Sequence, residues 1–217
     1  MTDAATRAGI AARRSALYWL LADFVLTPPD RAFVERLQGE LKAAPDCASA
    51  LALRLEEVRR ALPRPDDAPG IERLAVEHTR LFGGLRAGCG LPPPLETMRH
   101  DGSAAPETVA AIDNFYSDTG FNLTLQGVPA DHLGTELRFM ALLCHREMQA
   151  WQGGRTAEAK RALGRQRDFM QHHLGRWAPR YWRLAAADSQ HHFYRAAAMI
   201  ALDAASASPA LVEELLA

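Results

Sequence analysis

The sequence predicts an all-α protein, and three features of the chain support this fold class. Apolar residues recur three and four positions apart in almost every segment, the spacing that places them on one face of a helix. No segment shows the strict alternation of apolar and polar residues that is typical of a half-buried strand. Alanine, which has the highest helix propensity, is abundant throughout the chain. We therefore expect a single compact multi-helix bundle spanning residues 1–217.

The first half of the chain predicts four helices. Residues 15–25 are apolar on most sides, which predicts a central helix that ends at the turn around Pro28. Tyr18, Trp19 and Phe24 of this helix are predicted to lie in the core. The other three helices are predicted over residues 30–41, 48–62 and 71–82.

The second half of the chain predicts five more helices with the same periodicity. They cover residues 106–119, 129–151, 156–174, 177–184 and 189–205. Large aromatic residues in the last two segments are expected to seal these helices against the core, namely Tyr181, Trp182, Phe193 and Tyr194.

A long connection, residues 83–105, separates the two sets of helices. It contains four glycines before a triple proline that ends at Pro94. A connection of this length is uncommon in a compact domain unless it is functional or disordered, and its apolar and charged residues favour function. If the chain has two halves, residues 1–82 and 106–217 are joined by this loop, and two copies could exchange halves in a domain-swapped dimer.

Composition and charge exclude several classes of protein. The chain has 48% hydrophobic residues and a net charge of −1, so it can bury a sizeable core and has no field that would attract nucleic acid. Cys47, Cys89 and Cys144 form no C-x-x-C pair, so neither disulfides nor a zinc-thiolate site is predicted. There is no secretory signal and no uninterrupted apolar run of membrane-spanning length. We expect a cytoplasmic protein with reduced thiols.

The segment from Pro129 to Met140 is the strongest candidate for chemistry. Its first residues place an acid, an imidazole and another acid at the start of a predicted helix. Pro129 suits the first helical turn, where its missing N–H costs nothing, so this helix is predicted to begin near Pro129. Spacing by three and four then places His132, Glu136 and Phe139 on one stripe, polar at first and apolar afterwards. This stripe predicts a groove with a charged end.

Three blocks, in matching order and spacing, resemble the TorD/DmsD family of redox-enzyme maturation chaperones. They are Glu77-His78-Thr79-Arg80-Leu81-Phe82, the proline cluster with Glu96, and Pro129-Ala130-Asp131-His132 with Glu136-Leu137 and Phe139-Met140. The resemblance covers most of the chain and implies a TorD-like, all-helical, non-catalytic cytoplasmic chaperone without a cofactor. It also implies a client, a molybdopterin oxidoreductase bound through its twin-arginine leader and often its body, whose export is delayed until cofactor insertion and folding are complete.

The chain departs from the family pattern at three places. His78 stands where the family commonly has an aromatic residue four positions before Phe82, and a longer spacer than usual follows Gly83-Gly84. Thr97-Met98 replaces a small-aliphatic-aromatic ending. These differences bear on which molybdoenzyme is the client, which the sequence leaves open together with the choice between monomer and homodimer.

The resemblance also implies a binding site. A twin-arginine leader presents two guanidinium groups followed by an apolar segment, so its receptor needs carboxylates beside an apolar surface. The residues expected to bind the leader or the client are Glu77, Leu81, Phe82, Pro94, Glu96, Asp131, His132, Glu136, Phe139 and Met140.

Each of these residues also has a structural explanation. Asp131 can serve the helix start, and His132 with Glu136 can form an ordinary pair four residues apart on a helix. Leu81 and Phe82 can be core residues, because large apolar side chains usually pack inward.

Two other functions remain open. The pairs His172-His173 and His191-His192, with His145 and Asp188, could gather a metal ion in a helical enzyme. Adjacent histidines on a helix point about 100° apart, however, and the chain has no H-E-x-x-H or paired E-x-x-H motif. It also lacks a G-x-S-x-G nucleophile elbow and a P-loop, so no enzyme is predicted. The remaining alternative is a helical adaptor that binds a partner without recognising a leader.

Overall fold

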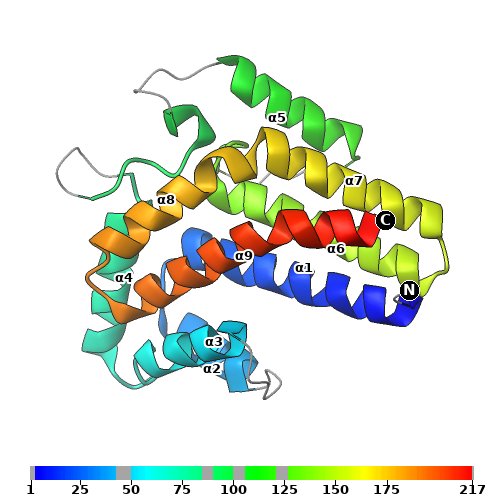
Figure 1. Cartoon of the computed structure of the whole chain (residues 1–217). Helices are drawn as coiled ribbons and strands as arrows, with labels where there is room; N and C mark the ends of the chain where they lie inside the picture. Colours follow the sequence, from blue (N-terminus) through cyan, green and yellow to red (C-terminus); the bar gives the residue numbers. More distant parts are fainter. Residues whose placement is uncertain (1–2, 43–49, 85–89, 100–105, 121–126, 217) are drawn as a thin grey trace. The chain divides into compact units, whose positions relative to one another are not determined.

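The computed structural model describes residues 3–42, 50–84, 90–99, 106–120 and 127–216 (Figure 1). Within these ranges the regular structure consists of nine α-helices and one 3₁₀ helix, with a single isolated bridge between Leu95 and His132. The predicted all-α class is confirmed. The elements are α1 (Ala4–Leu26), α2 (Arg31–Lys42), α3 (Ala50–Ala61), α4 (Ala68–Phe82), η1 (Glu96–Arg99), α5 (Pro106–Asp118), α6 (Leu133–Gln152), α7 (Thr156–His172), α8 (Leu174–Asp188) and α9 (His192–Leu216).

The chain forms two compact units that interleave along the sequence. Unit 1 comprises Met1–Asp23, Leu95–Ala178 and Ala205–Ala217, and unit 2 comprises Phe24–Pro94 and Pro179–Ala204. Neither unit matches the predicted halves 1–82 and 106–217, because α1, α8 and α9 each contribute residues to both units. Of the long connection, Leu91 to Pro94 belong to unit 2 and the segment with η1 belongs to unit 1. That the whole chain is one domain stays a prediction.

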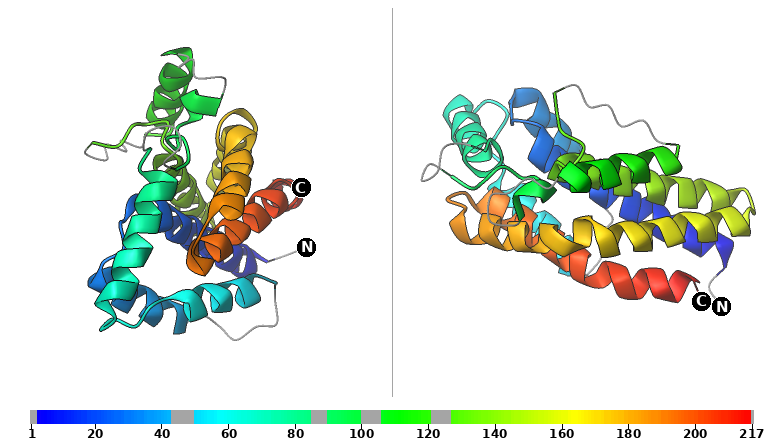
Figure 2. Two further views of the ribbon diagram at one scale, coloured as in Figure 1. Left: turned by 90° about the vertical axis from the view of Figure 1, so that its left-hand side faces the viewer. Right: turned by 90° about the horizontal axis from the view of Figure 1, so that it is seen from above.

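Unit 1 contains α5, α6 and α7 together with parts of α1, α8 and α9. Figures 1 and 2 show α7 lying alongside α6, to which it is joined by a short turn. One apolar cluster of this unit brings together Ala8 of α1, Trp151 of α6, Leu163 of α7 and Val212 of α9. The helical spacing of apolar residues thus buries one face of each helix in a shared core.

A buried polar network links three helices of unit 1. The Arg14 guanidinium donates to the Glu147 carboxylate at 3.1 Å, and the Gln166 amide N–H donates to the same carboxylate at 2.9 Å. Arg14 and the Cys144 thiol both donate to the Gln166 side-chain oxygen. Burial raises the pKa of Cys144 to about 12, so this thiol stays protonated and behaves as a small buried group. Cys47 and Cys89 lie outside the described residues.

Unit 2 contains α2, α3 and α4 with the adjoining parts of α8 and α9. Its core is aromatic: Phe82 packs against Trp182 and Tyr194, and Phe193 packs edge-to-face against Phe24. The predicted seal of the last helices by aromatic side chains is therefore confirmed. Tyr181, Trp182, Phe193 and Tyr194 are all buried.

Trp19 is wrongly predicted as a core residue. Its neighbour Tyr18 points inward, where its hydroxyl lies 3.2 Å from that of Ser208. Consecutive residues on a helix point about 100° apart, so Trp19 is turned outward and is 37% exposed. The Arg138 guanidinium covers its ring at 5.4 Å from the centroid. A cation–π contact therefore covers part of this ring at the surface.

Among the described helices, only α9 is long and apolar enough to span a membrane by length and composition. Core helices pass the same two tests. Ile200 and Val212 of α9 are buried inside the protein, as in a core helix. Length and composition alone are therefore weak evidence that α9 spans a membrane.

Candidate functional site

The Pro129–Met140 motif lies at the start of α6, in unit 1. The helix begins at Leu133, and His132 is its N-cap, with Nδ1 accepting the Gly134 N–H at 3.1 Å. The predicted start near Pro129 is wrong by about one turn. The preceding residues make other bonds, since the Pro129 carbonyl accepts the Thr135 hydroxyl at 2.9 Å.

Asp131 joins η1 to the start of α6 through hydrogen bonds. Its carboxylate accepts the Thr97 hydroxyl at 2.6 Å and the Thr97 N–H at 3.2 Å, and its carbonyl accepts the Glu96 N–H at 2.9 Å. The bridge between Leu95 and His132 adds a further backbone contact. Asp131 is only 3% exposed. Its observed contacts therefore join two segments that lie 34 residues apart.

Glu96 and Glu136 are also buried, 1% and 0% exposed respectively. The Glu96 carboxylate lies 3.1 Å from Nδ1 of His173, and both Glu136 oxygens accept the Trp177 indole N–H at 3.2 Å. His173 and Trp177 lie at the end of α7 and in the first turns of α8. Sequence reasoning did not assign either residue to this site, because pairs 77 and 41 residues apart leave no local pattern.

Three carboxyl groups thus gather in one region of unit 1; we call Glu96, Asp131 and Glu136 the acidic cluster. Burial, followed by the negative charges of Glu136 and Asp113, raises the pKa of Tyr116 well above its ordinary value, and Glu96 and Asp131 add to this effect. The Tyr116 hydroxyl donates to the Ala130 carbonyl at 2.9 Å. The three carboxyl groups thus lie in the same buried region as this phenol.

The apolar half of the predicted stripe lies in the core of unit 1. Phe139 and Met140 are fully buried, and the Phe139 ring packs against Tyr116 and Phe169 at centroid distances of 4.6 Å and 4.8 Å. The described arrangement therefore uses both residues for packing. Binding of a client by these side chains stays a prediction, and it would require them to become accessible.

The remaining predicted residues lie in unit 2. Glu77 accepts two hydrogen bonds from Arg80, at 2.7 Å and 2.9 Å, and the Gln190 N–H at 2.6 Å. Although burial alone would raise it, these bonds hold the pKa of Glu77 below its ordinary value. Leu81, Phe82 and Pro94 are buried, and the Leu81 carbonyl accepts the Tyr181 hydroxyl at 2.6 Å.

The structure therefore brings the predicted site residues together as two sets. Glu96, Asp131, His132 and Glu136 surround the start of α6 in unit 1, whereas Glu77, Leu81, Phe82 and Pro94 belong to unit 2. That the two sets form one groove stays a prediction.

The residues considered as alternative metal ligands have other contacts. Within the described ranges, no three His, Cys, Asp or Glu residues are placed to hold a metal ion. His172 is bonded to a backbone carbonyl one turn earlier, and His191 accepts the N–H of the residue two positions later. Asp188 pairs with Arg80, and His173 pairs with Glu96.

The chain is similar to known proteins in sequence and in fold. A family described as the nitrate reductase delta subunit matches residues 44–183, more than half of the chain. The chain belongs to this family. The resemblance to redox-enzyme maturation chaperones, seen first in three short blocks, is thereby confirmed.

Two curated relatives are named as assembly chaperones of reductases. The selenate reductase assembly chaperone protein of Thauera selenatis is 46% identical over 65 residues, which are 30% of this chain and 33% of that protein. The chlorate reductase assembly chaperone protein of Ideonella dechloratans is 33% identical over 139 residues, 59% of this chain and 66% of the relative. The matches thus span between a third and just under two thirds of the relatives' lengths.

One solved structure is also similar. It is a proposed redox enzyme maturation protein from Archaeoglobus fulgidus, with a TM-score of 0.49 and 18% sequence identity. The alignment covers 92% of this chain and 93% of that protein.

Proposed function

We propose that this protein is a cytoplasmic, non-catalytic assembly chaperone for a molybdopterin oxidoreductase. It binds the immature enzyme, through its twin-arginine leader or its body, until cofactor insertion and folding are complete. The observation that carries this proposal is membership of the nitrate reductase delta subunit family, together with two relatives named as assembly chaperones of reductases.

The acidic cluster supports recognition of the leader. Guanidinium groups form short, charge-assisted hydrogen bonds with carboxylates, and three carboxylates lie around the start of α6. Each of these carboxylates is already hydrogen-bonded within the chain, to Thr97, His173 or Trp177. The arginines of a leader would have to replace these partners. Each hydrogen bond to a charged carboxylate that is given up is worth about 1.5–3 kcal/mol net, so a micromolar complex of roughly 8 kcal/mol requires that the guanidinium groups of the leader replace these bonds with others of similar strength. Such an exchange is reversible, as a chaperone requires.

Capture of the client tests the assembly function. The tagged chain is expressed at its native level, and bound proteins are identified by mass spectrometry after gentle purification. We expect a molybdopterin oxidoreductase precursor that carries little molybdenum, because the chaperone acts before cofactor insertion is complete. Capture of only the mature, molybdenum-loaded enzyme, or of no such enzyme, would contradict the proposal.

Burial of the acidic cluster favours a second candidate, an assembly chaperone that grips the body of the reductase without recognising its leader. In that case the buried carboxylates serve only to hold η1 against α6. A client whose leader has been deleted separates the two functions. It is still captured by a leader-independent chaperone and is lost from a leader-binding one.

A further inference from the structure

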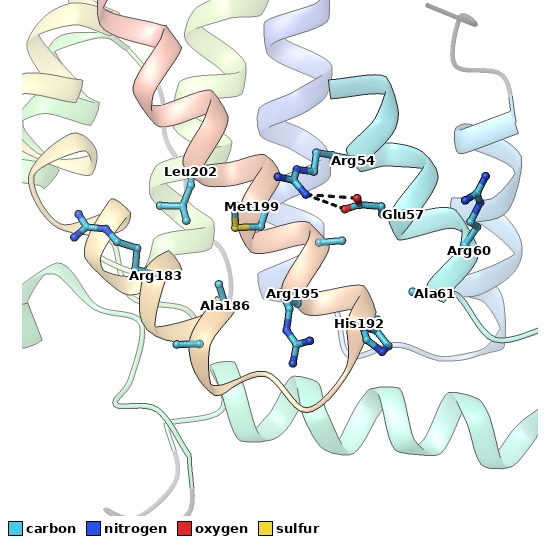
Figure 3. A pocket seen from close by; sticks show the side chains of 12 residues that line it. Arg54, Glu57, Arg60, Ala61, Arg183, Ala186, His192, Arg195, Met199 and Leu202 are labelled. Atoms are coloured by element: carbon cyan, nitrogen blue, oxygen red, sulfur yellow. Dashed lines mark hydrogen bonds and ion pairs between the residues drawn. The ribbon is translucent and has the colours of Figure 1, made fainter. Parts of the chain in front are cut away.

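Unit 2 contains a pocket that the sequence analysis did not find. It has a volume of about 920 Å³ and is bounded by α3, by the end of α8 and by the first half of α9 (Figure 3). All of its lining residues belong to unit 2. None of them is among the residues expected to bind a leader.

The floor of the pocket is apolar and follows helical spacing. Ala196, Met199 and Leu202 recur every three residues along α9, and Ala61 of α3 and Ala186 of α8 extend the floor on its two sides. Small side chains let another backbone approach closely. A strip of this kind suits the apolar face of a helix, whose side chains also recur every three to four residues.

The rim of the pocket is basic. Arg54, Arg60, Arg183 and Arg195 line it, and Glu57 is the one acid among the described residues that do so. Arg54 is paired with Glu57 at 3.1 Å and with Asp203 at 3.7 Å. Arg60 is paired with Glu56 at 2.7 Å, so Arg183 and Arg195 supply most of the positive charge of the rim. This rim attracts carboxylates and opposes the guanidinium groups of a twin-arginine leader.

The arginines surround the floor instead of converging on one point. Figure 3 shows Arg183 on α8 and Arg60 on α3 at opposite sides of the pocket, while Arg54 reaches toward Met199 of α9. A small anion would need donors directed at a single position. An apolar floor between separated cations instead fits a longer ligand with acidic flanks.

We propose that this pocket binds an amphipathic helix of a partner protein, with the apolar face on the α9 strip and acidic side chains against the arginine rim. The inference does not depend on leader binding, because the two ligands carry opposite charge.

Fluorescence anisotropy with synthetic peptides tests this assignment. The probe is a labelled helix of about 18 residues with leucines on one face and glutamates beside them. Two matched peptides accompany it, one with lysine in place of each glutamate and one with the acidic sequence scrambled to remove the apolar face. We expect micromolar binding of the acidic helix and at least about tenfold weaker binding of the other two.

Variants of the full chain locate the binding. Arg183→Glu combined with Arg195→Glu reverses the charge of the rim, and Met199→Glu places a charge on the floor; each should weaken binding of the acidic helix at least about tenfold. Arg161→Glu, an exposed charge reversal in unit 1, should leave the affinity unchanged. Circular dichroism verifies that all variants stay folded.

Three results would overturn the assignment. The first is equal binding of the acidic and lysine peptides, and the second is unchanged affinity in the rim and floor variants. The third is full displacement of the helix by inorganic pyrophosphate, which would make the pocket a small-anion site.

Discussion

Asp131 shows how a side chain that looks chosen for chemistry also has a structural task. Its carboxylate accepts both donors of Thr97, the backbone N–H and the hydroxyl, in a buried position. Buried donors that lose their acceptor cost more than the bond itself contributes. The stability of the η1 attachment therefore depends on an acceptor at residue 131, whereas leader binding would depend on the charge.

Substitutions at Asp131 separate these two roles. Asp131→Ala should lower the free energy of unfolding by about 1–3 kcal/mol, because both Thr97 donors are left without an acceptor. Asp131→Asn keeps an oxygen at that position and should cost clearly less. Urea unfolding measures both, with the exposed Asp66→Ala as a control that changes stability by no more than about 0.5 kcal/mol. Equal losses for the two substitutions would contradict the assigned hydrogen bonds.

His78, which replaces the usual aromatic residue, satisfies a helix end. The Val25 carbonyl lies in the last turn of α1, and the residue four positions later is Pro29, which has no N–H. The His78 ring nitrogen Nε2 lies 3.0 Å from this carbonyl and must carry the proton, since a carbonyl only accepts. Burial lowers the pKa of His78 to about 4, so the ring is neutral at ordinary pH.

This histidine makes stability depend on pH. Its contribution is fully present above its ordinary pKa of 6.5 and is lost as the pH falls toward 4, because the unfolded chain takes up a proton that the folded chain excludes. The loss should reach about 3 kcal/mol at most. Urea unfolding at about pH 7 and about pH 4.5 should show a smaller loss for His78→Phe than for the native chain. Identical losses in the two proteins would show that His78 does not titrate in this way.

Helices α1, α6 and α7 are joined by the buried pair of Arg14 and Glu147, with Gln166 as a third member. Breaking a buried pair leaves a charge without compensation, whereas replacing both members with apolar residues of similar size often costs little. The stability contributed by Arg14 therefore depends on the presence of Glu147, and this dependence couples the packing of the three helices.

A double-mutant cycle measures this dependence. Glu147→Met should cost about 3–5 kcal/mol, and Arg14→Met combined with Glu147→Met should cost less than that single substitution. The coupling energy should exceed about 1 kcal/mol. The exposed pair Arg36 and Glu40 is the matched control, for which we expect less than about 1 kcal/mol. Additive effects of Arg14→Met and Glu147→Met would contradict the role of the pair.

The existence and order of the helices follow from apolar periodicity and proline turns, but some boundaries do not. Pro129 suits a first helical position, yet α6 begins at Leu133. The residues just before the helix instead make a backbone bridge to Leu95. That contact joins distant parts of the sequence, so no local pattern records it. The predicted burial of Trp19 is wrong for a related reason. Hydrophobic character alone does not show which side of an apolar helix faces the core.

For the chain as a whole, the sequence identified the family and the acidic residues at the start of α6, but not their partners. His173 and Trp177 complete the acidic cluster from distant positions, and the arginine-rimmed pocket combines three helices. Such groupings arise only on folding. The two proposed binding sites differ in charge, since the buried acidic cluster lies in unit 1 and the arginine-rimmed pocket lies in unit 2.

Calorimetric titration of a twin-arginine leader peptide tests leader recognition by the acidic cluster most directly. The native chain should bind this peptide in the micromolar range, and at least about tenfold more weakly when both arginines are lysines, since only guanidinium groups bind carboxylates in a fork. Asp131→Asn combined with Glu136→Gln, which keeps the shape of the site and removes two of its three carboxylates, should cause a similar loss, while Asp66→Asn should cause none. Equal affinity for the two peptides, or unchanged affinity in the double variant, would contradict this recognition.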